Sequence, residues 1–166
     1  MHLIRSVRGK RIVFLSLVFV FFLTLLFFWN IYPVVYDTAL DVDKHPFVIV
    51  TKSMEHNGSS FQSWWDVHGR YYVDLGITVH QFEVFPFIDG IDKGDLVVTD
   101  ETPYESLRVG DVVIADIPRW GSIHHRIVRK FSEDGVNYIS TRGDANTRIA
   151  VFEQKIPEAS LQGVIV

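Results

Sequence analysis

The sequence predicts a mainly β domain that follows one N-terminal transmembrane helix. A long apolar run near the N-terminus has the length of a membrane-spanning helix. Beyond residue 45, short β-branched runs alternate with glycine-containing turns, as is typical of strands joined by tight connections. The length of 166 residues suits one folded domain, since domains have roughly 100–200 residues.

The predicted membrane helix covers residues 12–32. Between Ile12 and Trp29 only Ser16 and Thr24 are polar. A helix that crosses a bilayer core of about 30 Å needs roughly 20 residues, which this segment supplies. A cleaved secretory signal is the alternative, but its apolar region would be shorter and would end in small residues, whereas this run ends in Phe-Phe-Trp.

The flanks of the apolar run predict its orientation. Acidic residues follow it between Asp37 and Asp43, and four basic residues precede it: Arg5, Arg8, Lys10 and Arg11. Because basic flanks favour the cytoplasm, we expect a cytoplasmic tail (1–11), a linker (33–45) and an extracytoplasmic domain (46–166). A net charge of −4 gives no support to nucleic-acid binding, which needs a basic surface.

The expected strands of the outer domain are six short apolar runs: 47–50, 96–99, 112–115, 123–131, 136–140 and 161–166. The fourth and fifth flank a Ser-Glu-Asp-Gly segment that predicts a hairpin. Segments 92–98 and 108–114 each place a Gly-Asp turn before an apolar run, which predicts two similar entries into strands. The aromatic-rich stretch 61–88 is interpreted as an insertion of irregular strands and turns, without an amphipathic helix.

Ser53 is the candidate nucleophile for peptide-bond hydrolysis. The sequence has no cysteine, so a serine or threonine must be the nucleophile, and neither a disulfide nor a thiolate metal site can form. Ser53 follows an apolar strand in a polar segment, where a hydroxyl can be exposed. A serine that merely ends a strand fits the same local pattern.

His125 is the candidate general base among the seven histidines. Strand side chains alternate between two faces, so His125 shares the apolar face of Ile123 and Ile127, and His124 lies on the other face. This placement suits a base in a dry site. A buried structural histidine fits the pattern equally well.

The other histidines of the outer domain have simpler explanations. His56 is only three residues from Ser53, so a contact between the two side chains would require a tight bend. His68 and His80 belong to the aromatic insertion and are expected at its surface or at an interface.

Asp144 is the candidate carboxylate that orients the base. It follows Gly143 in a turn after the predicted hairpin, so the paired strand could carry it back beside His125. A carboxylate there would fix the imidazole tautomer, as in a Ser-His-Asp triad. An ordinary Asx turn is the simpler explanation of the same residues.

The order of these segments resembles type I signal peptidases of the archaeal and endoplasmic-reticulum branch. After the anchor come Lys-Ser-Met at 52–54, His-Arg at 125–126 and Gly-Asp-Ala-Asn at 143–146, and the likeness covers nearly the whole chain. The resemblance implies a signal-peptidase-like β-barrel or sandwich. It assigns Ser53 as nucleophile, His125 as base and Asp144 as its carboxylate, with no cofactor and no metal.

The resemblance also suggests that Thr51 supports the main-chain amide of Ser53 in an oxyanion hole, although an ordinary strand residue fits Thr51 equally well. Relatives often carry a second acidic residue six positions after the first, where this chain has Ala150 and a displaced Glu153 nearby. The bacterial branch uses a lysine base where this chain has His125, so the histidine branch is favoured.

The function that the resemblance implies is a membrane-bound serine endopeptidase that removes signal peptides from exported preproteins. Its partners would be signal-peptide-bearing preproteins, membrane lipid and the protein-export machinery, and no nucleic acid. A non-catalytic, membrane-tethered β module that binds exported proteins or a secretion partner is the alternative. A peptidase with another substrate, such as a pilin-like or pheromone precursor, is the third hypothesis.

Overall fold

The computed structural model describes residues 14–30 and 44–166. The chain divides into two compact units, Met1–Val42 and Asp43–Val166. The predicted tail, the two ends of the predicted membrane helix and the predicted linker up to residue 43 lie outside the described residues.

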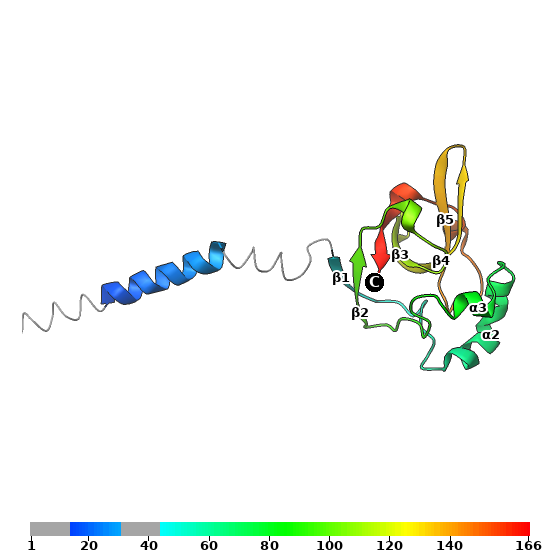
Figure 1. Ribbon diagram of the computed structural model, residues 1–166, viewed down its shortest axis with the longest axis horizontal. Helices are drawn as coiled ribbons and strands as arrows, with labels where there is room; N and C mark the ends of the chain where they lie inside the picture. Colours follow the sequence, from blue (N-terminus) through cyan, green and yellow to red (C-terminus); the bar gives the residue numbers. More distant parts are fainter. Residues whose placement is uncertain (1–13, 31–43) are drawn as a thin grey trace, which may run out of the picture. The chain divides into compact units, whose positions relative to one another are not determined.

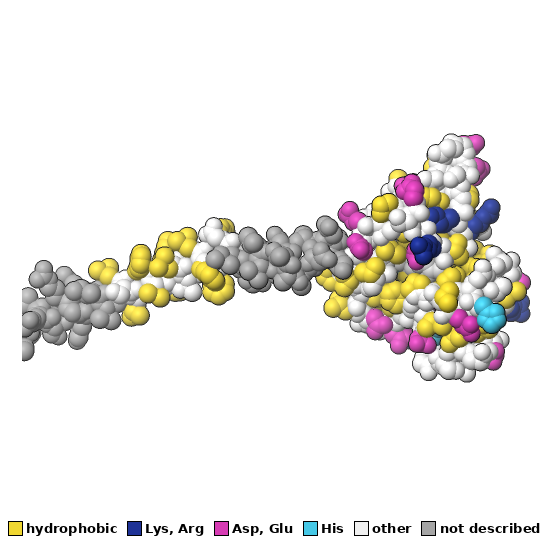
Figure 2. All heavy atoms as spheres, viewed as in Figure 1, with side chains coloured by type: hydrophobic (Ala, Val, Ile, Leu, Met, Phe, Trp, Pro, Cys, Tyr) yellow, Lys and Arg dark blue, Asp and Glu magenta, His cyan; other side chains and the backbone are white. Residues whose placement is uncertain are grey.

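Residues 14–30 form a helix covered with hydrophobic side chains (Figures 1 and 2). Two of its polar side chains, Thr24 and Asn30, donate hydrogen bonds back to the carbonyl oxygens of Val20 (2.6 Å) and Leu26 (2.8 Å). Within the described ranges, no helix reaches the combined length and apolarity of a membrane span. The transmembrane helix over 12–32 therefore stays a prediction.

Residues 44–166 form one seven-stranded antiparallel sheet in the order β1-β2-β7-β3-β4-β5-β6 (Figure 1). The mainly β class is thereby confirmed. The strands are β1 (Lys44–Val48), β2 (Leu96–Asp100), β3 (Val112–Ile117), β4 (Gly121–Glu133), β5 (Val136–Arg142), β6 (Ile156–Pro157) and β7 (Leu161–Ile165). Three short 3-10 helices connect them: η1 (Tyr104–Ser106), η2 (Val151–Glu153) and η3 (Glu158–Ser160).

The predicted hairpin is the β4–β5 pair. Glu133 pairs with Val136, so only Asp134 and Gly135 form the turn. Both have positive φ angles, 52° and 76°, as a type I′ turn requires. The turn therefore sets how β5 runs back along β4.

The two Gly-Asp segments form equivalent turns before β2 and β3. The Asp95 carboxylate accepts from the main-chain amide of Asp92 at 2.9 Å, and the Asp111 carboxylate accepts from that of Arg108 at 2.7 Å. Each aspartate thus closes its own turn three residues back, which explains the similarity of the two sequences.

The aromatic insertion is helical, so its interpretation as irregular strands and turns is wrong. It contains α2 (Phe61–Val73) and α3 (Val79–Phe82), which begin after Ser60 and Thr78. The side chain of each of these two residues accepts from a main-chain amide three residues later. Gly69 in the middle of α2 lowers its helical propensity, so the sequence pattern does not predict this helix.

A buried cluster fastens the helical insertion to the sheet. Trp64 and Tyr72 of α2 and Phe82 of α3 pack with Ile77 and with Val128 of β4. Tyr72 and Phe82 are fully buried. Because β4 also carries His125 and Arg126, this cluster brings the insertion to the strand that holds the candidate base.

Candidate active site

Ser53 and His125 lie in hydrogen-bonding contact, with 2.8 Å between Ser53 Oγ and His125 Nε2. Ser53 lies in the turn region after β1 and is half-buried, whereas His125 lies in β4 opposite Val113 and is 8% exposed. The structure thus brings together the predicted nucleophile and the predicted base.

Glu153 holds the other nitrogen of the imidazole. His125 Nδ1 donates to Glu153 Oε1, which also accepts from the Thr141 hydroxyl at 3.1 Å. Glu153 Oε2 accepts from the Ala150 amide at 3.3 Å, and the side chain is only 1% exposed. Since an ionised carboxylate only accepts, Nδ1 carries the imidazole proton and Nε2 accepts from the serine hydroxyl.

Asp144 does not orient His125, which corrects the sequence-based assignment. The two imidazole nitrogens of His125 already have Glu153 and Ser53 as partners. Asp144 instead contacts Arg126, the next residue of β4, whose side chain points to the opposite face of the strand. The hairpin therefore returns Asp144 to the strand as expected, but to its other face.

Asp144 is the centre of a buried polar cluster. Arg126 donates to both of its oxygens at 2.9 and 2.7 Å, Tyr72 donates to Oδ1 at 2.5 Å, and His56 Nε2 lies 3.0 Å from Oδ2. Burial acts to raise the pKa of the Asp144 carboxyl. The Arg126 charge and these hydrogen bonds outweigh burial and hold that pKa well below its usual range.

Arg126 is anchored by main-chain oxygens as well as by Asp144. Its Nη1 donates to the carbonyls of Pro86 at 2.7 Å and Gly110 at 2.8 Å, and its Nη2 donates to Phe87 at 3.0 Å. Arg126 is completely buried. These five hydrogen bonds to four residues fix the position of the guanidinium. The guanidinium in turn holds Asp144 in place from β4.

Thr51 lies beside the nucleophile, with 3.2 Å between its Oγ1 and Ser53 Oγ. A serine that donates to His125 can accept from Thr51 at the same time. The Ser53 amide donates to no acceptor among residues 44–166. Thr51 thus contacts the candidate nucleophile through its hydroxyl and not through a bond to that amide.

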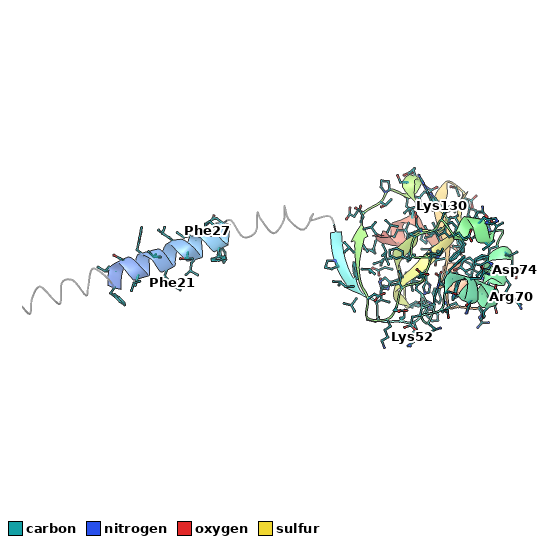
Figure 3. The ribbon with its side chains drawn as sticks, turned by 60° about the horizontal axis from the view of Figure 1, so that its bottom comes forward. Phe21, Phe27, Lys52, Arg70, Asp74 and Lys130 are labelled. Atoms are coloured by element: carbon teal, nitrogen blue, oxygen red, sulfur yellow. The ribbon has the colours of Figure 1, made fainter. Side chains whose placement is uncertain are left out.

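Lys52 points away from Ser53, although it is the adjacent residue. Its ammonium lies 3.3 Å from Glu55 Oε2, and its side chain is 73% exposed. Figure 3 shows Lys52 at the rim of the domain with its side chain directed outward. The site therefore has an imidazole, and not a primary amine, on the serine hydroxyl.

The sequence interpretation missed three residues that complete these contacts: Glu153, His56 and Tyr72. The sequence presents Glu153 as a displaced acid, and its position inside the one-turn helix η2 turns it toward His125. The closeness of His56 to Ser53 in the sequence argues against a contact between them, and in the structure His56 is buried and faces Asp144. Glu153 accepts from the Ala150 amide at the start of η2, but alanine has no side-chain acceptor, so the sequence carries no capping-box signal for Glu153.

Comparisons with protein-family models, with curated proteins and with solved structures find no match. Residues 44–166 and 14–30 contain no cluster of three or more histidine, aspartate or glutamate side chains with the geometry of a metal site.

Proposed function

We propose that this chain is a membrane-bound serine endopeptidase with Ser53 as nucleophile and His125 as general base. The observation that carries the proposal is the hydrogen-bonded row of Ser53 Oγ, the His125 imidazole and Glu153. Such a row supplies a nucleophile, its base and the group that orients the base. Glu153 replaces Asp144 as the orienting carboxylate in this proposal.

The reaction would proceed by acyl transfer. His125 Nε2 takes the hydroxyl proton while Ser53 Oγ attacks the peptide carbonyl, and the same proton passes from the imidazolium to the leaving amine. A water then gives a proton to His125 and attacks the acyl-enzyme, and the imidazolium returns that proton to Ser53 Oγ as the acid product leaves. The Ser53 amide and the Thr51 hydroxyl are the candidate donors to the oxyanion.

The substrate class rests on the resemblance to type I signal peptidases. We infer exported preproteins, cut after small side chains, by a signal-peptidase-like β-barrel or sandwich domain outside the membrane. β1 is the edge strand of the sheet, and the chain continues from it to Ser53. An extended signal peptide could therefore add a strand there.

The proposal is tested with the full chain in lipid vesicles and a secretory preprotein that has small residues before its cleavage site. The wild-type chain should release one mature product, with its new N-terminus identified by mass spectrometry. Ser53→Ala should release none, whereas the control Ser59→Ala, an exposed serine in the next turn, should match the wild type. Equal product from Ser53→Ala, or none from folded wild type, would refute a serine peptidase.

A further inference from the structure

We propose that helix α2 positions the nucleophile, through the Tyr72 hydroxyl and the Asp144 carboxylate. This inference rests on the proposed peptidase function. It assigns to the aromatic insertion 61–88 a part in the chemical step, and it makes Tyr72 and Asp144 positioning residues that touch neither substrate nor Ser53 Oγ.

The first step is the contact between α2 and Asp144. Tyr72 is fully buried, and its hydroxyl donates to Asp144 Oδ1 at 2.5 Å. Burial and the Asp144 charge raise the Tyr72 pKa well above its ordinary value, so the phenol keeps its proton and acts as a donor. Trp64, about two turns earlier in α2, stacks on the His56 ring with 3.8 Å between centroids. Two of the three side chains around Asp144 are therefore held by α2.

The second step is the contact between the Asp144 segment and Ser53. The Ala145 amide donates to the Ser53 carbonyl at 2.8 Å, and the Asp144 amide faces Met54 Sδ at 3.5 Å. A Cβ on Gly143 would lie 2.7 Å from the Ser53 carbonyl oxygen and 2.9 Å from His125 Nε2. Residues 143–145 thus pack directly on both the nucleophile and the base.

The positions of these groups are coupled because the contacts are short and Asp144 is fully buried among its partners. If Asp144 shifts, the Ala145 amide moves with it, and the Ser53 carbonyl follows. A misplacement of about 1 Å at a reacting group can cost as much as 10²-fold in rate. Removing one of several ligands of Asp144 should cause a smaller shift, so we expect a loss of about tenfold.

The test is Tyr72→Phe in the full chain, which removes one hydroxyl and keeps the ring. We expect kcat to fall about tenfold with KM unchanged, because the contact acts on the reacting geometry and not on substrate affinity. We also expect faster hydrogen exchange at the Ala145 amide, measured by NMR. Tyr71→Phe is the matched control, since this neighbouring tyrosine packs its ring on Arg70 and Arg142. It should leave both readouts unchanged.

The outcomes separate the inference from the proposed function. Unchanged kcat in Tyr72→Phe, or a lower kcat without faster Ala145 exchange, would overturn the positioning route, even if the melting temperature falls. Wild-type protein that cleaves nothing would refute the peptidase, while Ala145 exchange would still report on the link to Tyr72. If Tyr72→Phe does not fold, Ser60→Ala weakens the start of α2 from outside the cluster. Unchanged Ala145 exchange in that variant would equally overturn the inference.

Discussion

The two buried histidines of the described residues each pair with a carboxylate, in different surroundings. His125 pairs with Glu153, and their side chains are 10% and 1% exposed. His56 pairs with Asp144, and both side chains are fully buried. The far nitrogen of His125 meets the Ser53 hydroxyl, whereas the Nδ1 atom of His56 has no hydrogen-bond partner among the described residues.

Under the proposed function, this difference separates a pair that transfers protons from one that holds structure. The Asp144 carboxylate has a permanent positive partner in Arg126, and its four hydrogen bonds leave no place for a reacting group. The Glu153 carboxylate has no such partner, and its imidazole opens toward a half-buried hydroxyl. The neighbour of the histidine, and not the pair itself, distinguishes the two.

The largest expected effect comes from the two residues that face each other at the first pair. Ser53→Ala and His125→Ala should each lower kcat by about 10⁴-fold or more, and the double variant should be little worse than either. His56→Gln, the matching change at the second pair, should lower the free energy of unfolding and should reduce kcat far less than His125→Ala does. A folded His56→Gln without activity, beside an active His125→Ala, would reverse the assignment of the two pairs.

Glu153→Gln should lower kcat by roughly 10³–10⁴-fold with little change in KM, because an amide no longer selects the tautomer with the proton on Nδ1. Steady-state kinetics on the preprotein measure the effect. Glu158→Gln, at an exposed glutamate in η3, is the control and should behave as the wild type. A Glu153→Gln variant with normal kcat would show that Glu153 is not the carboxylate that orients His125.

Arg126→Met should destabilise the domain by about 3–5 kcal/mol, since it leaves the Asp144 charge buried without its main partner. Urea unfolding followed by circular dichroism measures this change. Arg129→Met, at an exposed arginine on the same strand, should change the free energy of unfolding little. Equal effects of the two substitutions would mean that the buried pair does not hold the fold.

The second pair should also make the domain sensitive to acid. The folded state holds the Asp144 pKa below its usual value, mainly through Arg126 working against burial, so the unfolded chain takes up the proton first as pH falls. The stabilisation is present above about pH 5 and is lost below about pH 4, where a free carboxyl titrates. Urea unfolding across this range should show the loss, and Asp144→Asn should show a flatter dependence. If the free energy of unfolding changed with pH equally in the wild type and in Asp144→Asn, Asp144 would not be the source of the acid sensitivity.

The smallest effects are expected beside the first pair. Lys52→Ala should change kcat less than about twofold, because the ammonium pairs with Glu55 and points outward. His124→Ala should retain much of the activity. Burial and the neighbouring His125 lower the His124 pKa. The His124 ring packs toward Phe47, with 6.3 Å between the two ring centroids. Loss of cleavage in Lys52→Ala with normal folding would favour a lysine base.

Local rules account for the parts that the sequence predicted. The β4–β5 hairpin follows from a two-residue Asp-Gly turn, and the two Gly-Asp entries follow from aspartates that close turns three residues back. Strand patterns allow Ser53 an exposed hydroxyl and place His125 on the apolar face, whereas their selection as nucleophile and base depends on the resemblance to type I signal peptidases. None of these predictions needed knowledge of distant contacts.

Distant contacts decide the parts that the sequence did not predict. The choice between Asp144 and Glu153 depends on which face of β4 each residue meets after the loop that follows β5, and no local pattern encodes that path. Helix α2 was hidden because few of its positions are buried, namely Trp64, Gly69 and Tyr72. Its packing partners come from β4 and from α3, which pattern analysis of one segment does not see.

Strand β4 places His125 and Arg126 side by side, one for each network. A slip of the strand by one residue would move every side chain to the other face, so that His124 or Arg126 would take the place of His125 beside Ser53. The pairing of His125 with Val113 on one side and of Arg126 with Arg142 on the other excludes that slip. The strand pairing that completes the sheet is therefore also the step of folding that places His125 beside Ser53 and Arg126 beside Asp144.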